Sequence, residues 1–474
     1  MSLSSLSINK RFLWIALLGY TSLFFLSIWY YQERTFFADI AFHLFYILKD
    51  NDYAIQNGRF GSVITQSIPL IGQELGWSLK SIAIAYSAGF ILLYGSIFLL
   101  LWGLLKNRVV ALVMLLQSTL LVGGTFFWIQ SEFPQGLAFM LLTFGIITRK
   151  ADLKDYYKLE LLLLIPMLIT VVYFHPLIFI PFTYICAFLW LSQDRLPVNR
   201  IVLGASFGVF WLVYLLKSTL LKVVYEYDSS ALSRLKHFLT LFPNYFFIES
   251  NANFFLYIAT VAFLILLFGM LYWYAHQKNW LKFLLLLSFS VGYFLLVGVS
   301  FSQSQFSQYY MENLYLPLSI IVAFPFVVDG LPQLKEHWQI AALSFIVLTC
   351  MGRVVFYSPP YTQRLDWQKE LLAKTATLPN KKLFIDSKDV PKDVLLHTYW
   401  SSPYEFWLLS SIDASSSEGA RSILIHDTPT SFNDAINSTH LFVTYWGNFS
   451  YEALPKPYFN FNDNSPYIHY NPKD

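Results

Sequence analysis

Long apolar stretches separated by short polar connections make up the first three-quarters of the chain. A membrane-spanning α-helix needs about 20 largely apolar residues, and fewer where the bilayer is thin. We expect eleven such helices, at residues 11–31, 81–105, 108–128, 134–148, 158–174, 176–192, 201–222, 252–275, 281–300, 311–330 and 338–356. The pattern predicts an all-α polytopic membrane domain over residues 1–356, followed by a more polar part over residues 357–474.

The apolar stretch 158–192 tests this count. As a single helix it would be roughly 50 Å long, against about 30 Å of hydrocarbon. Basic residues flank both of its ends, and proline disfavours helical geometry in the residue before it, so His175-Pro176 is the predicted turn between two spans. The alternative is one tilted, kinked helix.

Basic residues in short connections predict the orientation, because cytoplasmic loops are rich in Lys and Arg. With the N-terminus in the cytoplasm, alternate connections hold Lys10, Arg11, Lys106, Arg108, Arg149, Lys150, Lys154, Arg195, Arg200, Lys278, Lys282 and Lys335. The opposite turns at residues 129–133, 175 and 301–308 contain neither Lys nor Arg. Eleven crossings then place the C-terminal part outside the cytoplasm, which is the periplasm if the cell is Gram-negative.

Two regions lie outside the predicted spans. In the outer loop 32–80, Asp39, His43, Tyr46 and Asp50 recur at helical spacing opposite a stripe of apolar residues, which predicts an amphipathic helix in the membrane interface. In the C-terminal part we expect a small α/β domain. Its predicted elements are a helix at residues 367–376 and short buried strands at 382–386, 422–426 and 441–446.

Composition supports the membrane assignment and excludes several classes. The 474 residues are 56% hydrophobic and 13% charged, whereas soluble domains carry about 25% charge. A net charge of +3 is too small to indicate a nucleic-acid partner. Both cysteines, Cys186 and Cys350, lie in apolar segments, so no disulfide framework is implied. No phosphate-cradling glycine loop occurs, so a cytoplasmic nucleotide-sugar or ATP site has little support.

Three ionisable residues, Asp39, Glu132 and His175, fall on the predicted outer side, and a functional role is the default for such groups beside hydrocarbon. Asp39 is a candidate general base, or else a helix cap or solvated residue. Glu132 is a candidate second acid, or else a partner of the helix dipole. His175 orients a phosphate or hydroxyl, or else binds a carbonyl at the helix break.

Further polar residues lie at the same predicted level. Arg59 carries a planar guanidinium suited to phosphate, with a snorkelling interfacial arginine as the alternative. His43 shares the polar stripe of Asp39. Tyr309, Tyr310 and Glu312 enter the tenth span, where the tyrosines also suit an aromatic belt. The sequence names no certain cofactor and leaves the need for a divalent metal undecided.

Short motifs in this arrangement resemble the GT-C superfamily of polytopic membrane glycosyltransferases, of the protein-mannosyltransferase and lipid A aminoarabinose-transferase type. The similar motifs are Phe37-Ala38-Asp39, Ser131-Glu132-Phe133-Pro134, Phe174-His175-Pro176, and Tyr309-Tyr310 followed by Leu314-Tyr315-Leu316-Pro317. Gly58-Arg59-Phe60 also looks like phage-type O-antigen glucosyltransferases. Family members often have two adjacent acids in the first outer loop, whereas Asp39 has no acidic neighbour.

The resemblance implies transfer of a sugar, with inversion, from a polyprenyl-phosphate donor to a glycan, lipid or protein acceptor at the outer face. Asp39 would be the base and Glu132 the second acid, with His43, Arg59, His175, Tyr309, Tyr310 and Glu312 binding substrate. Membrane lipids would surround the transmembrane helices. The alternatives are a transporter or flippase for lipid-linked sugars, an assembly protein acting through its outer tail, and an O-antigen polymerase or ligase.

Overall fold

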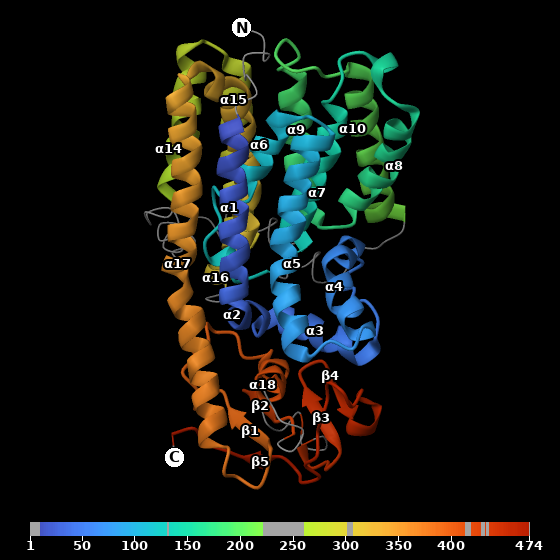
Figure 1. The fold of residues 1–474 in the computed structure, drawn as a ribbon, viewed down its shortest axis with the longest axis vertical. Coiled ribbons are helices and arrows are strands. Elements are labelled where there is room, and N and C mark those ends of the chain that lie inside the picture. Colours follow the sequence, from blue (N-terminus) through green and yellow to red (C-terminus); the bar gives the residue numbers. More distant parts are fainter. Residues whose placement is uncertain are drawn as a thin grey trace.

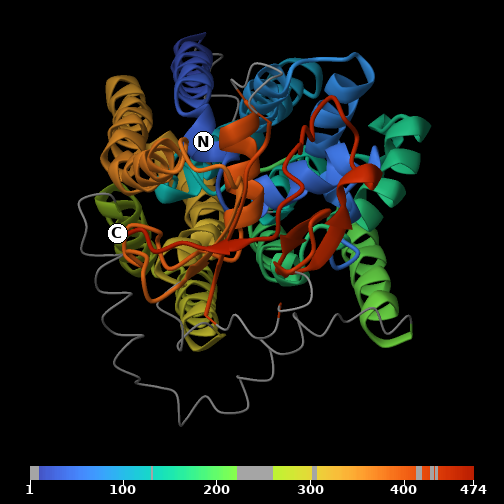
Figure 2. The same cartoon turned by 90° about the horizontal axis from the view of Figure 1, so that it is seen from below.

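The protein is a helical bundle with a small α/β part at one end (Figure 1). The computed structural model describes residues 10–129, 132–220, 260–300, 307–412, 419–427, 432 and 436–473, without the side chains of residues 220, 299, 300 and 307–311. The long helices run along the long axis of the molecule. Viewed from below, the C-terminal part lies across the end of the bundle (Figure 2).

Within the described residues, six helices are long and apolar enough to cross a membrane, which indicates a multi-pass membrane protein. They are α1 (Lys10–Trp29), α5 (Leu79–Leu99, continued by a π turn to Leu104), α10 (Arg200–Leu215), α15 (Trp280–Ser300), α16 (Ser307–Pro325) and α17 (Glu336–Lys374). Five shorter helices overlap the other predicted spans: α6 (Arg108–Gln117), α7 (Glu132–Ile147), α8 (Lys158–Val172), α9 (Phe179–Trp190) and α14 (Val261–His276). The span predicted at 108–128 is wrong in its second half, because α6 ends at Gln117 and residues 118–129 form a loop with one 3₁₀ turn (Gly124–Phe126). Residues 252–259 of the eighth predicted span lie outside the described part. The number of eleven crossings stays a prediction.

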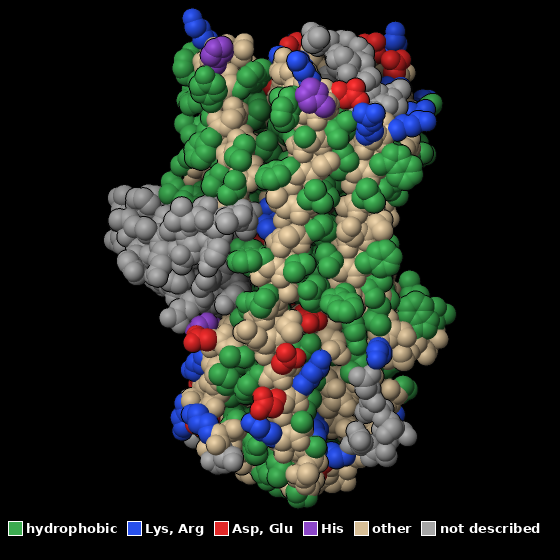
Figure 3. Space-filling view, turned by 60° about the vertical axis from the view of Figure 1, so that its left-hand side comes forward, with side chains coloured by type: hydrophobic (Ala, Val, Ile, Leu, Met, Phe, Trp, Pro, Cys, Tyr) green, Lys and Arg blue, Asp and Glu red, His purple; other side chains and the backbone are tan. Residues whose placement is uncertain are grey.

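The side-chain distribution fits a bundle surrounded by lipid. Charged side chains gather toward the two ends of the molecule, with a largely uncharged band between them (Figure 3). Trp14, Leu18 and Phe25 of α1 are each more than 60% exposed, which is costly in water but not in hydrocarbon. Helix α16 is the central helix, and almost all of its apolar stretch is buried by its neighbours.

The predicted turn at His175 is confirmed. Helix α8 ends at Val172, His175 is extended (φ −158°, ψ 141°), and a short 3₁₀ turn (Pro176–Ile178) leads into α9. The single kinked helix is therefore wrong, because the residue before the proline leaves helical geometry as expected.

The loop 32–80 contains three helices: α2 (Tyr31–Thr35), α3 (Ala38–Asp50) and α4 (Val63–Glu74). Helix α3 covers the predicted amphipathic segment, but its polar stripe is not a free surface. His43 on that stripe is 1% exposed, and the ring of Phe45 contacts the aromatic rings of Tyr404 and Trp407 in the C-terminal part. Helix α3 is thus packed between α4 and the C-terminal part, since its aromatic residues bury more area there than at an exposed interface.

The C-terminal part is the predicted small α/β unit. Strands β1 (Lys382–Asp386) and β2 (Ser422–His426) match the predicted strands residue for residue and pair in parallel, with β5 (Ile468–His469) on the other edge of β1. Strands β3 (Leu441–Thr444) and β4 (Gly447–Ser450) form an antiparallel pair, and α18 (Ser402–Ser411) packs against β2.

Helix α17 joins the two parts without a break. Its 39 residues span roughly 58 Å, about twice the hydrocarbon thickness, and it passes through the predicted boundary at residue 357. Pro359 and Pro360 lie inside it. Pro359 has no N–H for the carbonyl of Val355, and the Ser358 hydroxyl donates to that carbonyl instead, at 2.9 Å. The predicted helix 367–376 is the end of α17.

The opposite end of the bundle holds a buried ionic cluster. The Asp329 carboxylate accepts hydrogen bonds from Tyr274 (2.6 Å) and Lys282 (2.8 Å) and pairs with Arg195 (3.0 Å). This one carboxylate thus pairs with two of the cations used to predict orientation, the buried Lys282 and the partly exposed Arg195. The positive-inside argument then rests on the remaining basic residues.

Candidate functional site

Asp39 lies in the first turn of α3 and is partly buried. It is not the helix cap, which is Phe37. The indole N–H of Trp128 donates to Asp39 Oδ2 at 3.2 Å, and no cation contacts the carboxylate among the described residues. Burial raises the pKa of Asp39 to about 6; the Trp128 bond and Arg59 oppose this rise, and the charge of Glu132 adds to it. Such a carboxylate is ionised at neutral pH yet basic enough to accept a proton.

Arg59 and Glu132 form a buried ion pair beside Asp39. Arg59 Nη1 lies 3.0 Å from Glu132 Oε2, and both side chains are less than 10% exposed. Asn57 and Gly58 both have positive φ (49° and 63°), a tight turn for which Asn and Gly are suited, and Arg59 follows it directly. The predicted second acid is thus already neutralised by the predicted phosphate ligand. Ser131, which precedes Glu132 in the quoted motif, lies outside the described residues.

His43 is held in a polar layer between α3 and α4. Gln66 Nε2 lies 3.2 Å from His43 Nδ1 and donates to the Ala54 carbonyl at 3.2 Å. Burial lowers the pKa of His43 to about 4, which Glu132 opposes. The imidazole is therefore neutral at physiological pH. It lies one helical turn after Asp39, within the electrostatic reach of Glu132 and Arg59.

His175 reaches the same region from the turn between α8 and α9. Its ring stacks on Phe133 with centroids 4.2 Å apart, next to Glu132, and its Nδ1 accepts from the Leu177 N–H at 3.2 Å. Burial, together with the charges of Arg59 and Lys217, holds the pKa of His175 well below its usual range. With Nδ1 used as a helix cap, the proton of the neutral ring resides on Nε2, which remains as a donor for a ligand oxygen.

Close packing explains why His175 is fixed there. Phe174 fits between Gly61 and Gly136, and a Cβ atom added at either glycine would lie 2.3–2.5 Å from the nearest Phe174 atom. Any larger residue would displace Phe174. Gly61 in the 3₁₀ turn Phe60–Ser62 and Gly136 in α7 thus leave room for the ring that precedes His175.

The loop that carries Trp128 is clamped by side chains that the sequence did not single out. The fully buried Arg34 donates to the Phe126 carbonyl, to Ser87 Oγ (2.8 Å) and to the Ser87 carbonyl (3.0 Å). Arg353 donates to the carbonyl of Val122 at 3.0 Å. From the sequence, an arginine near the end of a membrane span is expected to be a surface cation. No local pattern therefore predicts that Arg34 and Arg353 bind backbone carbonyls.

Glu312 belongs to the same clamp. Its carboxylate accepts from the backbone N–H groups of Gly123 (2.6 Å), Gly124 (2.9 Å) and Thr125 (3.0 Å) and from the Thr125 hydroxyl (2.8 Å). A carboxylate with four such contacts anchors the loop, so we leave Glu312 out of the proposed substrate contacts. Tyr309 and Tyr310 lie in the first turn of α16, and their side chains lie outside the described part.

A cavity of about 40 Å³ borders the site through Trp128 and Pro134, with Arg34, Gln117 and Ser118 among its lining residues. From the sequence we also expect Asp39, Glu132 and His175 to line one outward cavity, and this stays a prediction. Among the described residues, no group of three His, Cys, Asp or Glu side chains is arranged to hold a metal ion.

The arrangement places one basic carboxylate, a neutralised Arg–Glu pair and two neutral histidines at the end of the bundle that faces the α/β part. Such a set of side chains can accept a proton at Asp39 and donate hydrogen bonds to an anionic or hydroxyl group. No protein-family model and no curated protein matches this chain. The interpretation of the site therefore depends on the geometry described above.

Proposed function

We propose that this protein is a membrane glycosyltransferase that moves a sugar from a polyprenyl-phosphate donor to an acceptor hydroxyl. The observation that carries the proposal is Asp39, a partly buried carboxylate with a pKa raised to about 6, beside the buried Arg59–Glu132 pair. A general base works best when its pKa lies near the working pH. The position of the site at the end of an apolar bundle suits a donor whose lipid lies in the bilayer.

In the proposed reaction, Asp39 accepts the proton of the acceptor hydroxyl as that oxygen attacks the anomeric carbon of the donor. The bond between the anomeric carbon and the phosphate oxygen breaks, and the lipid phosphate leaves with the electron pair. Attack opposite to the leaving group inverts the anomeric centre. Arg59 and the Nε2–H of His175 are the proposed contacts of the phosphate, with Glu132 holding the guanidinium in place.

The finer topology is also part of the proposal. We infer eleven crossings with the N-terminus in the cytoplasm and with Asp39, His175 and the α/β part on the outer face. Reporter fusions after Lys150 should give a cytoplasmic signal, and fusions after His175 and Asp393 an extracytoplasmic one. A cytoplasmic signal at Asp393 would contradict the eleven-crossing topology.

Sugar transfer by detergent-purified protein from a synthetic polyprenyl-phosphate donor tests the function. Asp39→Asn keeps the shape of the side chain but removes its ability to accept the proton, so transfer should fall by about 10²- to 10⁴-fold. Asp50→Asn is the matched control, because Asp50 is the exposed last residue of the same helix. Equal turnover in both variants would reject Asp39 as the base.

A further inference from the structure

The start of α3, directly before Asp39, has an unusual backbone. Phe37 is extended (φ −141°, ψ 126°) and provides no side-chain cap, and Ala38 has a positive φ of 42°. A residue with a Cβ atom rarely adopts this conformation and keeps it only where its surroundings impose it. The Ala38 N–H donates to Glu405 Oε1 at 2.9 Å. The first N–H group of α3 is thus bound by a carboxylate from the C-terminal part, 367 positions later in the chain, in place of a side chain of the cap residue Phe37.

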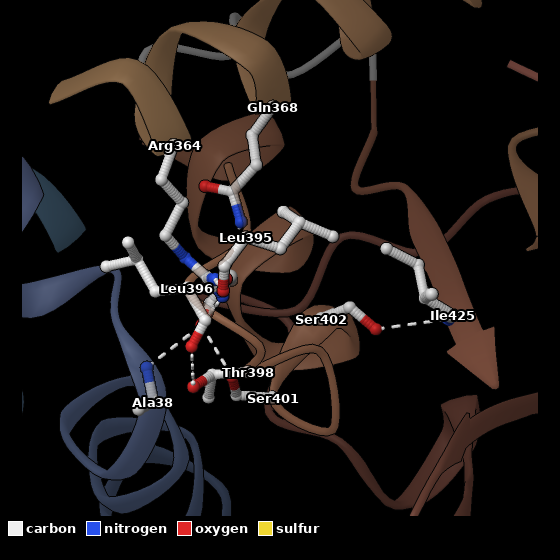
Figure 4. A network of polar contacts seen from close by, with 10 residues as sticks. Ala38, Arg364, Gln368, Leu395, Leu396, Thr398, Ser401, Ser402 and Ile425 are labelled. Atoms are coloured by element: carbon white, nitrogen blue, oxygen red, sulfur yellow. Dashed lines mark hydrogen bonds and ion pairs between the residues drawn. The ribbon is translucent and has the colours of Figure 1, made fainter. Parts of the chain in front are cut away.

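Glu405 is fully buried, and donors from several elements surround it. Arg364 Nη2 donates to both carboxylate oxygens (2.8 and 2.6 Å), and Gln368 and Ser401 each donate to one oxygen. Figure 4 shows Arg364 and Gln368 reaching down from α17 while Ala38 and Ser401 approach from the opposite side. The network therefore ties α17, α18 and α3 together at one point.

A second path leads from the same network to Asp39. The Arg364 guanidinium lies over the ring of Phe37, 5.1 Å from its centroid. The Phe37 ring packs edge-on against Trp128, with centroids 4.8 Å apart, and Trp128 donates to Asp39. The network thus supports both the backbone that precedes Asp39 and the indole that binds its carboxylate.

We propose that Glu405 is a positioning residue for Asp39, so that the C-terminal α/β part completes the active site rather than forming a separate module. The proposal rests on the proposed function only for the role of Asp39 as base. Its physical basis is that Glu405 binds the first N–H group of α3 at Ala38. Glu405 also holds Arg364, which lies over the Phe37 ring that packs against Trp128. A misplacement of about 1 Å in a reacting group costs about 100-fold in rate.

Hydrogen–deuterium exchange tests the structural half of the proposal without any substrate. In Glu405→Gln and Glu405→Ala, the amides of residues 38–42 should exchange at least about tenfold faster than in the wild type, because the cap of α3 is weakened or lost. Glu370→Gln is the matched control, since Glu370 is an exposed residue of α17 paired only with Lys374 in the described part. Unchanged exchange at residues 38–42 would overturn the proposal, whatever the protein catalyses.

Transfer kinetics test the functional half. Glu405→Gln should lower kcat about 10- to 100-fold with KM unchanged, and should move the acid limb of kcat/KM to lower pH as water reaches Asp39. Adding Ala38→Gly should restore part of kcat, since glycine adopts positive φ without support. Wild-type kinetics in Glu405→Gln would overturn the positioning role. Absence of transfer in the wild type would instead reject the proposed function and leave the exchange result to decide the structural half.

Discussion

Replacing Asp39 by Asn should stabilise the fold while it slows the proposed sugar transfer. The pKa of Asp39 is about 6 in the folded protein against an ordinary value of 3.8. Above pH 6 Asp39 is ionised in both states, but its ionisation costs more free energy in the folded protein than in the unfolded chain. Ionised Asp39 therefore lowers the free energy of unfolding. A difference of about two pH units corresponds to about 3 kcal/mol. Asn keeps an oxygen for the Trp128 N–H and carries no such penalty.

The expected change in Tm and its dependence on pH both follow from the pKa of Asp39. An unfolding entropy of about 2.1 cal/mol/K per residue over 474 residues gives about 1 kcal/mol/K, so 3 kcal/mol raises Tm by about 3 °C. The folded state takes up the Asp39 proton as pH falls through 6, so the advantage of Asn is full above pH 7 and disappears toward pH 4.

Melting of both proteins in the same detergent, followed by intrinsic fluorescence between pH 4.5 and 8, measures this difference. Asp50→Asn should show no comparable rise in Tm at pH 8, because Asp50 is exposed. A Tm for Asp39→Asn equal to or below the wild type at pH 8 would refute the reasoning, since it would mean that ionised Asp39 carries no burial penalty.

Four further substitutions test the site. Arg59→Ala and Glu132→Ala should each destabilise the protein by about 3–5 kcal/mol in detergent melts, because each leaves a buried charge unpaired, and the double variant should cost less than their sum; additive costs would argue against the pair. Gly136→Ala should cost about 1–3 kcal/mol by displacing Phe174, and a smaller side chain at 174 should relieve it; no loss would show that the ring has room. Glu312→Ala should increase hydrogen exchange at residues 123–125, and unchanged exchange would remove its anchoring role.

The sequence allowed prediction of the features that depend on local composition. Apolar stretches predicted the helices, because a helix that spans a membrane needs apolar side chains along its whole length, both where it faces lipid and where it faces other helices. Strands β1 and β2 were predicted residue for residue, since short apolar runs between polar turns suit parallel strands buried on both faces. The turn at His175 followed from the proline after it.

Long-range contacts explain what the sequence did not predict. Nothing near Ala38 indicates that its N–H binds Glu405, or that Arg34 binds the loop before Trp128. The partnership of Arg59 with Glu132 joins two motifs that each had a separate predicted role. Each of these contacts links segments more than 70 positions apart, so only the packing of the bundle brings them together.

The pH dependence of sugar transfer tests the central claim most directly. With a synthetic polyprenyl-phosphate donor, kcat/KM of the wild type should rise as pH increases through about 6 and then level off, because ionised Asp39 accepts the acceptor proton. Asp39→Asn should be about 10²- to 10⁴-fold slower without that rise. Transfer by the wild type with no acid limb near pH 6, or the same profile in Asp39→Asn, would contradict the account.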